Sequence, residues 1–169
     1  MKAHFQMFAG YNAWANGRLY AASAELSEAD YRADLGAYFK SVEGTLNHLM
    51  IGDLLWIARF RGQAMPKLPL TDILHDNLPD LTAARKVLDA DIVRLIDEMP
   101  PDRFGKSFTY RAMTLPGEQS QVLAEALSHF FNHQTHHRGQ VHALLSRLGL
   151  KAPPLDLLYY QRGSVPEAG

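Results

Sequence analysis

The chain has 169 residues, 17 of them basic and 18 acidic, and it contains no cysteine. A chain of this length can bury a sizeable core, so we expect a single domain over residues 1–169. With a formal net charge of −1, nothing favours binding to a nucleic acid. Without cysteine, disulfides, thiolate ligands and cysteine nucleophiles are excluded, so any metal ion must be bound by nitrogen or oxygen.

No targeting or membrane signal is evident. Residues 1–6 (MKAHFQ) lack the apolar segment of a signal peptide. No uncharged apolar stretch approaches the roughly 18 residues that a membrane helix needs. We therefore expect a soluble cytoplasmic protein without a membrane partner.

The first half of the chain predicts two helices. One runs from about His4 to Glu25, because apolar residues recur there at steps of three and four and so share one helical face. The second runs from about Tyr38 to Arg61 and is apolar on more than one face, which is typical of a helix covered by several neighbours. Gly62 is expected to end it.

The second half predicts two more helices. The third opens at Asn77, a good N-cap residue, and stops at Pro100. The fourth runs from about Ser120 to Leu148 and ends at Gly149. Gly139 lies inside the fourth helix, where glycine costs about 1 kcal/mol relative to alanine, so we expect another backbone to approach closely there.

Between Arg103 and Ser120 the helical period disappears. Lys106–Tyr110 and Met113–Gly117 are predicted to form two short strands or an extended loop. Four long helices with one long connection predict an all-α fold, a four-helix bundle with a short extended or hairpin segment before the last helix.

Five of the eight histidines lie within residues 128–142. Residues four apart on a helix share a face, so His133 and His137 can direct their imidazoles at one metal ion, and so can His129 and His133. Spacing alone does not choose between these pairs. His136 lies toward the same side as His133, whereas His142 is expected on the opposite side, facing solvent.

A third ligand is expected from another helix, and His48 is the candidate. It lies in an apolar segment with Gly44 and Gly52 one turn away on the same face, which leaves room beside its imidazole. Alternatively, the glycines only allow close helix packing, and His48 alone would be a hydrogen-bonded core histidine. Three neutral imidazoles on a divalent ion leave a coordination position open, as in catalytic sites. Gln134 follows His133 where the zinc-protease motif has glutamate, so that hydrolytic route is not expected.

Three stretches resemble the DinB/YfiT-like family of metal-binding four-helix bundles, and the resemblance covers nearly the whole chain. They are residues 11–16 (YNAWAN), 46–49 (LNHL) and 131–140 (FNHQTHHRGQ). In that family a histidine of the second helix and two histidines four apart in the fourth bind the metal. The resemblance therefore implies His48, His133 and His137 as ligands, rather than His129.

Some members of that family are metal-dependent transferases or isomerases that use a low-molecular-weight thiol such as mycothiol or bacillithiol. The resemblance implies one divalent transition metal ion, zinc or nickel, and an S-transferase acting in stress or detoxification. The alternatives are a hydrolase that uses a metal-bound water and a non-enzymatic metal-binding stress protein, for which a fourth protein ligand would be diagnostic. His129 and His136 are candidates for proton transfer, although packing is the simpler role.

Other residues leave their roles open. Aromatic residues such as Tyr11, Trp14 and Trp56 are expected in the core more than in a pocket wall. Asp53 lies in an apolar stretch and needs a partner, either an arginine or an imidazole proton. A homodimer is expected, because relatives often pair and Leu155–Tyr160 offers apolar surface.

Overall fold

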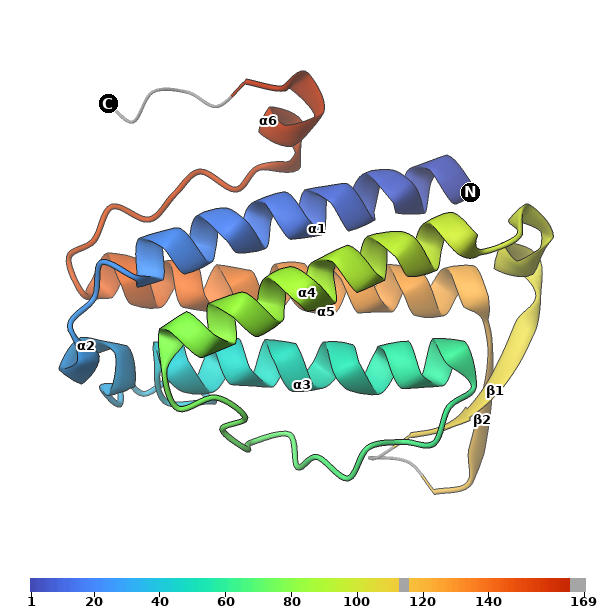
Figure 1. Ribbon diagram of the computed structural model, residues 1–169, viewed down its shortest axis with the longest axis horizontal. Coiled ribbons are helices and arrows are strands. Elements are labelled where there is room, and N and C mark those ends of the chain that lie inside the picture. Colours follow the sequence, from blue (N-terminus) through green and yellow to red (C-terminus); the bar gives the residue numbers. More distant parts are fainter. Residues whose placement is uncertain (113–115, 165–169) are drawn as a thin grey trace.

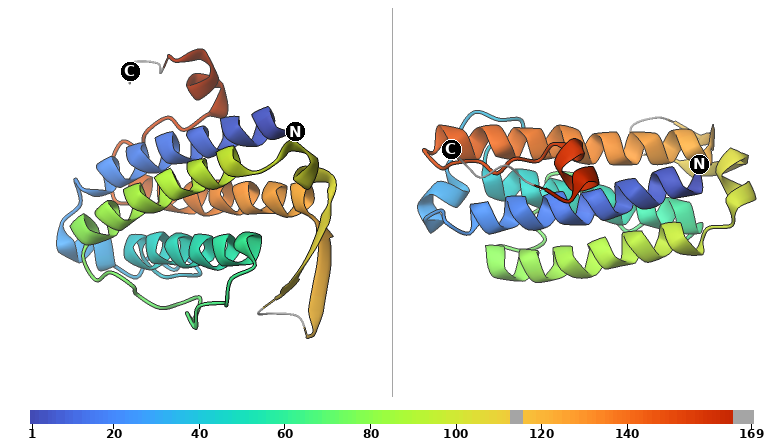
Figure 2. Two further views of the ribbon diagram at one scale, coloured as in Figure 1. Left: turned by 45° about the vertical axis from the view of Figure 1, so that its right-hand side comes forward. Right: turned by 90° about the horizontal axis from the view of Figure 1, so that it is seen from above.

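Four long helices lie side by side with roughly parallel axes (Figures 1 and 2). The computed structural model describes residues 1–112 and 116–164. The long helices are α1 (Lys2–Ser23), α3 (Val42–Arg61), α4 (Leu78–Glu98) and α5 (Leu123–Arg147). The shorter elements are α2 (Glu28–Arg32), the 3-10 helix η1 (Pro101–Gly105), α6 (Leu157–Arg162) and the antiparallel strands β1 (Ser107–Arg111) and β2 (Glu118–Val122).

The fold is thus mostly helical with a small two-stranded sheet, and the prediction of an all-α four-helix bundle describes only its larger part. The short helices α2 and α6 were not predicted. The first strand falls where one was expected. The second predicted strand is wrong in position, since β2 begins at Glu118, and Met113–Leu115 lie outside the described residues.

Capping and strand pairing decide where the helices begin. The predicted start of the second helix at Tyr38 is wrong, because Lys40 adopts a left-handed φ of 66° that a helix cannot contain. Ser41 then caps α3 by accepting a hydrogen bond from the backbone of Gly44 at 3.0 Å. The last long helix begins at Leu123 rather than Ser120, because Ser120 pairs with β1.

α3 and α4 run in the same direction, so the chain must return between them. Helix α1 packs against α4 and α5, and α3 packs against α5. Residues 62–77, the crossover segment, carry the chain back along the outside of α3 (Figure 1). Asn47 anchors this segment, since its Oδ1 atom accepts hydrogen bonds from the backbones of Leu74 and His75 at 2.9 and 3.1 Å.

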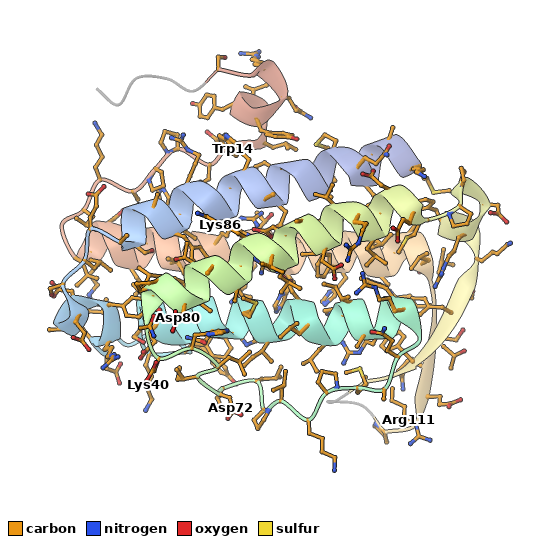
Figure 3. All side chains as sticks on the ribbon, viewed as in Figure 1. Trp14, Lys40, Asp72, Asp80, Lys86 and Arg111 are labelled. Atoms are coloured by element: carbon orange, nitrogen blue, oxygen red, sulfur yellow. The ribbon has the colours of Figure 1, made fainter. Side chains whose placement is uncertain are left out.

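The core between the long helices is apolar, while charged side chains such as Lys40, Asp72, Lys86 and Arg111 lie on the outside (Figure 3). One polar network crosses the core. Asp53 on α3 pairs with Arg85 on α4 at 2.6 Å, and Arg85 also pairs with Asp89 at 2.8 Å. Gln134 of α5 donates to Asp53, and Asn16 of α1 donates to Asp89 at 3.0 Å. Of the two partners expected for Asp53, the structure therefore contains the arginine.

The structure differs from the expected packing at Gly139 and at the C-terminal segment Leu155–Tyr160. A Cβ atom on Gly139 would meet nothing within 4 Å, so the predicted close approach there is wrong. The tail before Gly163 packs on α1, where the Tyr160 ring lies 5.8 Å from Trp14 and fills the space beside Gly10. Leu158 remains exposed.

Among the helices of residues 1–112 and 116–164, none combines the length and apolar character that a membrane span requires.

Candidate metal centre

His48, His133 and His137 meet between α3 and α5. Their candidate ligand atoms all lie within 4.8 Å of one another, a grouping that could hold a metal ion. The Nε2 atoms of His48 and His133 are 3.3 Å apart. Two nitrogens bound to one tetrahedral ion at about 2.0–2.1 Å would be separated by about 3.3 Å, so this spacing fits. The group includes the predicted pair His133 and His137 and leaves out His129.

The two glycines near His48 have different roles. A Cβ atom on Gly52 would lie 3.1 Å from Cε1 of His133, so this glycine leaves space for the ring of a ligand from the neighbouring helix. A Cβ atom on Gly44 would lie 2.1 Å from the backbone oxygen of Phe39, so Gly44 instead admits the loop that precedes α3. The expected room was beside the imidazole of His48, whereas the ring that Gly52 accommodates is that of His133, from the neighbouring helix α5.

Hydrogen bonds orient two of the three rings. Nδ1 of His48 lies 3.0 Å from the backbone oxygen of Leu70, and Nδ1 of His137 lies 2.7 Å from Oε1 of Gln140. Both partners are acceptors, so each Nδ1 carries the proton and donates it. Each Nε2 therefore keeps its lone pair, which is the arrangement that partners of metal-binding histidines impose.

The imidazoles are neutral at physiological pH. Burial, together with the neighbouring imidazoles, lowers the pKa of His133 to about 3, and burial lowers the pKa of His137 to about 4. Burial also lowers the pKa of His48. A metal ion binds only the deprotonated ring, so the site is prepared for a cation.

His133 is the ring with an unpaired atom. Its Nδ1 is buried without a hydrogen-bond partner in the described part of the chain, and its Nε2 faces that of His48. Buried polar atoms are normally paired. Nε2 of His48 is unprotonated, and a cation beside it would also bind the lone pair of a ring nitrogen of His133, so the residues present fit a bound metal ion.

The site opens onto a cavity of about 360 Å³, here named the site cavity. His48 and His133 contribute to its wall, as does His129, whose ring lies 5.1 Å from Trp56. Burial and the nearby charge of Arg59 lower the pKa of His129. The remaining lining residues are Gly52, Leu55, Trp56, Arg59, Leu70, Tyr110, Ala112 and Gln121. None of the lining residues in the described part of the chain is a carboxylate.

The two candidate proton carriers lie in different places. Both are exposed, but His129 lines the site cavity, whereas His136 lies outside its lining and accepts a hydrogen bond from Gln140 at 3.3 Å. Gln140 therefore links His136 to His137. Trp56 is buried in the core and also lines the cavity, so it has both of the roles considered for it.

Several residues of the site were not identified from the sequence. The Phe39 ring stacks on His48 with ring centres 3.8 Å apart, and the backbone oxygen of Leu70 orients the same histidine. Neither has a sequence signal, because both come from irregular segments. Gln140 follows His137 by three residues on one helix, and that spacing alone would have allowed the contact to be expected.

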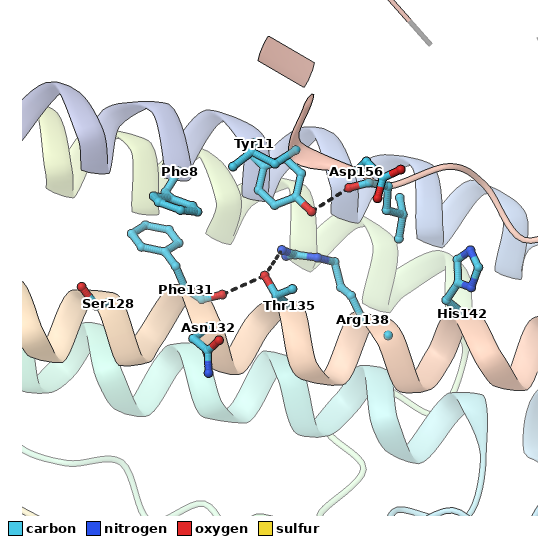
Figure 4. A pocket seen from close by; sticks show the side chains of 12 residues that line it. Phe8, Tyr11, Ser128, Phe131, Asn132, Thr135, Arg138, His142 and Asp156 are labelled. Carbon is cyan, nitrogen blue, oxygen red and sulfur yellow. Dashed lines mark hydrogen bonds between the residues drawn. The ribbon is translucent and has the colours of Figure 1, made fainter. Parts of the chain in front are cut away.

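A second cavity, of about 550 Å³, lies between α1, α5 and the segment before α6 (Figure 4). Its wall includes Tyr11, whose hydroxyl donates to the backbone oxygen of Leu155 at 2.7 Å, and Arg138, whose guanidinium lies 5.2 Å from the centre of the Tyr11 ring. His142 also lines it, half-buried and on the opposite side of α5 from the three histidines. The predicted direction of His142 is confirmed, but its full exposure is not.

The fold and site define a class of protein: a helical bundle with three neutral histidines, from two adjacent helices, placed to bind a metal ion beside a cavity. The DinB family model matches residues 1–168, and the chain belongs to the DinB family. It is 27% identical over 158 residues to the Protein DinB of Bacillus subtilis (strain 168), an alignment that covers 89% of each chain.

A solved structure shows the same fold. The crystal structure of a DinB-like protein from Bacillus cereus ATCC 10987 superposes with a TM-score of 0.66 at 12% sequence identity. The match covers 87% of this chain and 94% of the other. The family model confirms the resemblance that the three stretches of the sequence carried.

Proposed function

We propose that this protein binds one divalent transition metal ion, zinc or nickel, through His48, His133 and His137, and that it transfers a low-molecular-weight thiol to an electrophile in stress or detoxification. The observation that carries the proposal is the convergence of three neutral imidazoles, two of which, His48 and His133, line the site cavity. A site with three nitrogen ligands keeps a position for substrate.

The composition of the site supports an enzyme over a closed metal store. The grouping contains three residues, and no fourth histidine or carboxylate of the described chain joins it. Three neutral ligands leave the charge of a bound dication uncompensated, so such an ion stabilises a thiolate near neutral pH. Among residues 1–112 and 116–164, no carboxylate lines the cavity as a general base for hydrolysis, which favours the thiol reaction over the hydrolytic one.

The protein's own residues then have defined roles in the proposed reaction. Leu70 and Gln140 fix the rings of His48 and His137. Leu55 and Trp56 form an apolar wall that limits water around the substrate. His129 is neutral because its pKa is lowered, so a ring nitrogen can accept the proton that the thiol releases.

Metal content tests the site. Untagged protein, purified without added metal, is expected to contain one transition metal ion per chain by elemental analysis. His48→Ala and His133→Ala should lose it, whereas His142→Ala, a matched histidine on the far side of α5, should retain it. Equal metal content in all four proteins would overturn the site.

Turnover tests the reaction. The metal-loaded protein is incubated with cellular thiols and a chromogenic electrophile, and thiol-dependent product formation is expected to disappear with His133→Ala and with chelation. Ester or amide turnover that needs no thiol would instead support the hydrolase. Turnover unaffected by His133→Ala would refute the proposed role of the metal.

A further inference from the structure

Arg59 is a cation in the wall of the site cavity, and it has no anionic partner among the described residues. Its guanidinium lies over the ring of Trp56 at 4.6 Å and over that of Tyr110 at 5.4 Å. Its Nε atom is buried without a hydrogen-bond partner in the residues that the structure describes. Burial accordingly lowers the pKa of Arg59.

The neighbouring arginines differ from Arg59. Arg61, two residues further along α3, forms two hydrogen bonds with Asp91 at 2.8 and 2.9 Å. Arg85, buried in the core, pairs with Asp53 and Asp89. Removing a cation from water without an opposite charge is unfavourable. Arg59 thus lacks the carboxylate that both of these arginines have.

The surroundings of Arg59 favour a negatively charged ligand. The wall of the site cavity combines this guanidinium with His48, His129 and His133, and the described residues contribute no carboxylate to it. A metal ion at the centre would add two positive charges to the same space. Clefts lined by one sign of charge concentrate ligands of the other sign.

The contacts with the two aromatic rings determine which N–H groups of Arg59 can bind a ligand. The guanidinium carbon lies over the rings of Trp56 and Tyr110, and contacts with ring faces do not use N–H groups, so the two Nη groups remain able to donate to a ligand. The edge of a guanidinium matches the two oxygens of a carboxylate or of a phosphate. A lysine would not provide this geometry.

We propose that the site cavity takes an anionic substrate and that Arg59 binds its oxyanion, a carboxylate or a phosphate. Because Arg59 is assigned to a substrate, this proposal rests on the proposed function. His133 packs on Gly52, and Gly52 lies seven residues before Arg59 on α3, about 10 Å along the helix axis. A metabolite of ordinary size spans that length, so its oxyanion can lie at Arg59 while its reacting group is at the three histidines.

Binding of simple anions tests the subsite without any turnover. Benzoate, phenyl phosphate and the neutral benzamide are titrated into the full-length protein, as purified and again after chelation, with tryptophan fluorescence as the readout. One or both anions should bind saturably to both forms, and benzamide should not. The tighter of the two anions identifies the substrate group as carboxylate or phosphate.

Variants assign the binding to Arg59. Arg59→Gln should weaken anion binding at least tenfold, Arg59→Lys should weaken it less, and Arg61→Gln, the matched control, should leave it unchanged. Urea unfolding midpoints establish that each variant is folded. Absence of anion binding to the native protein, or equal binding by Arg59→Gln and the native protein, would overturn the subsite.

Kinetics separates this proposal from the proposed function. At unchanged metal content, Arg59→Gln should raise KM more with a thiol that carries a carboxylate than with a thiol that lacks one. An equal loss with both thiols would contradict the subsite. If the proposed metal site is wrong, the purified protein will contain no metal but will still bind anions at Arg59.

Discussion

His137 donates its Nδ1 proton to Oε1 of Gln140 at 2.7 Å, one turn further along α5. This contact fixes which nitrogen of His137 remains free for a metal ion. Replacing Gln140 by alanine should therefore weaken metal binding by about tenfold, because partners of ligating histidines typically contribute that much. Competition with a chromogenic chelator measures the affinity. Asn132→Ala, an exposed amide on the same helix, is the control, and equal affinities of the two variants would contradict the role of Gln140.

Substitution by alanine should weaken metal binding at Gly52 and stabilise the fold at Gly139. A Cβ atom at Gly52 would lie 3.1 Å from the His133 ring, so Gly52→Ala should displace that ring and lower metal affinity. A Cβ atom at Gly139 would meet nothing within 4 Å in the interior of α5, so Gly139→Ala should raise the free energy of unfolding by about 0.5–1 kcal/mol. Chelator competition and urea unfolding measure the two effects. Unchanged metal affinity in Gly52→Ala would count against the packing of His133 described above.

The stability of the metal-free protein should fall in mild acid. In the unfolded chain His133 and His137 titrate near the ordinary value of 6.5, whereas in the folded chain their pKa values are lowered to about 3 and 4. Below pH 6.5 the unfolded chain therefore binds protons that the folded chain does not, and the free energy of unfolding decreases as the pH falls toward 4. Above pH 6.5 the two residues contribute no pH dependence.

Urea unfolding midpoints between pH 7.5 and 4.5 measure this dependence. His133→Asn should show a smaller decrease than the native protein over the same range, because one titrating group has been removed. The same slope in both proteins would show that other groups dominate the acid response.

The buried pair Asp53 and Arg85 should be necessary for stability. Arg85→Ala leaves Asp53 and Asp89 in the core without their cation, and we expect the free energy of unfolding to fall by about 3–5 kcal/mol. Lys106→Ala, which removes an exposed pair with Asp102, should leave the urea midpoint unchanged. A midpoint of Arg85→Ala close to the native one would mean that water compensates the carboxylates.

The sequence by itself determined the local elements and the candidate ligands. Apolar periodicity and the Asn77 cap predicted four long helices, since these signals act between residues close in the chain. The spacing of His133 and His137 predicted that their rings share a face, and the family resemblance selected them over His129. The same local reasoning failed at Tyr38 and Ser120, where a left-handed residue and a strand partner override the helical pattern.

Only the tertiary structure decided what surrounds the three histidines. The contacts from Leu70 and Phe39 to His48 come from irregular segments, whose positions depend on the packing of the whole chain. Arg85 is 32 residues from Asp53, so no local pattern could pair them. Likewise, Arg59 is one of many basic residues in the sequence, and only the folded chain places it beside two aromatic rings, in a cavity wall whose described residues include no carboxylate. Helical spacing extends over a few residues, whereas burial, charge pairing and cavity shape arise where distant segments meet.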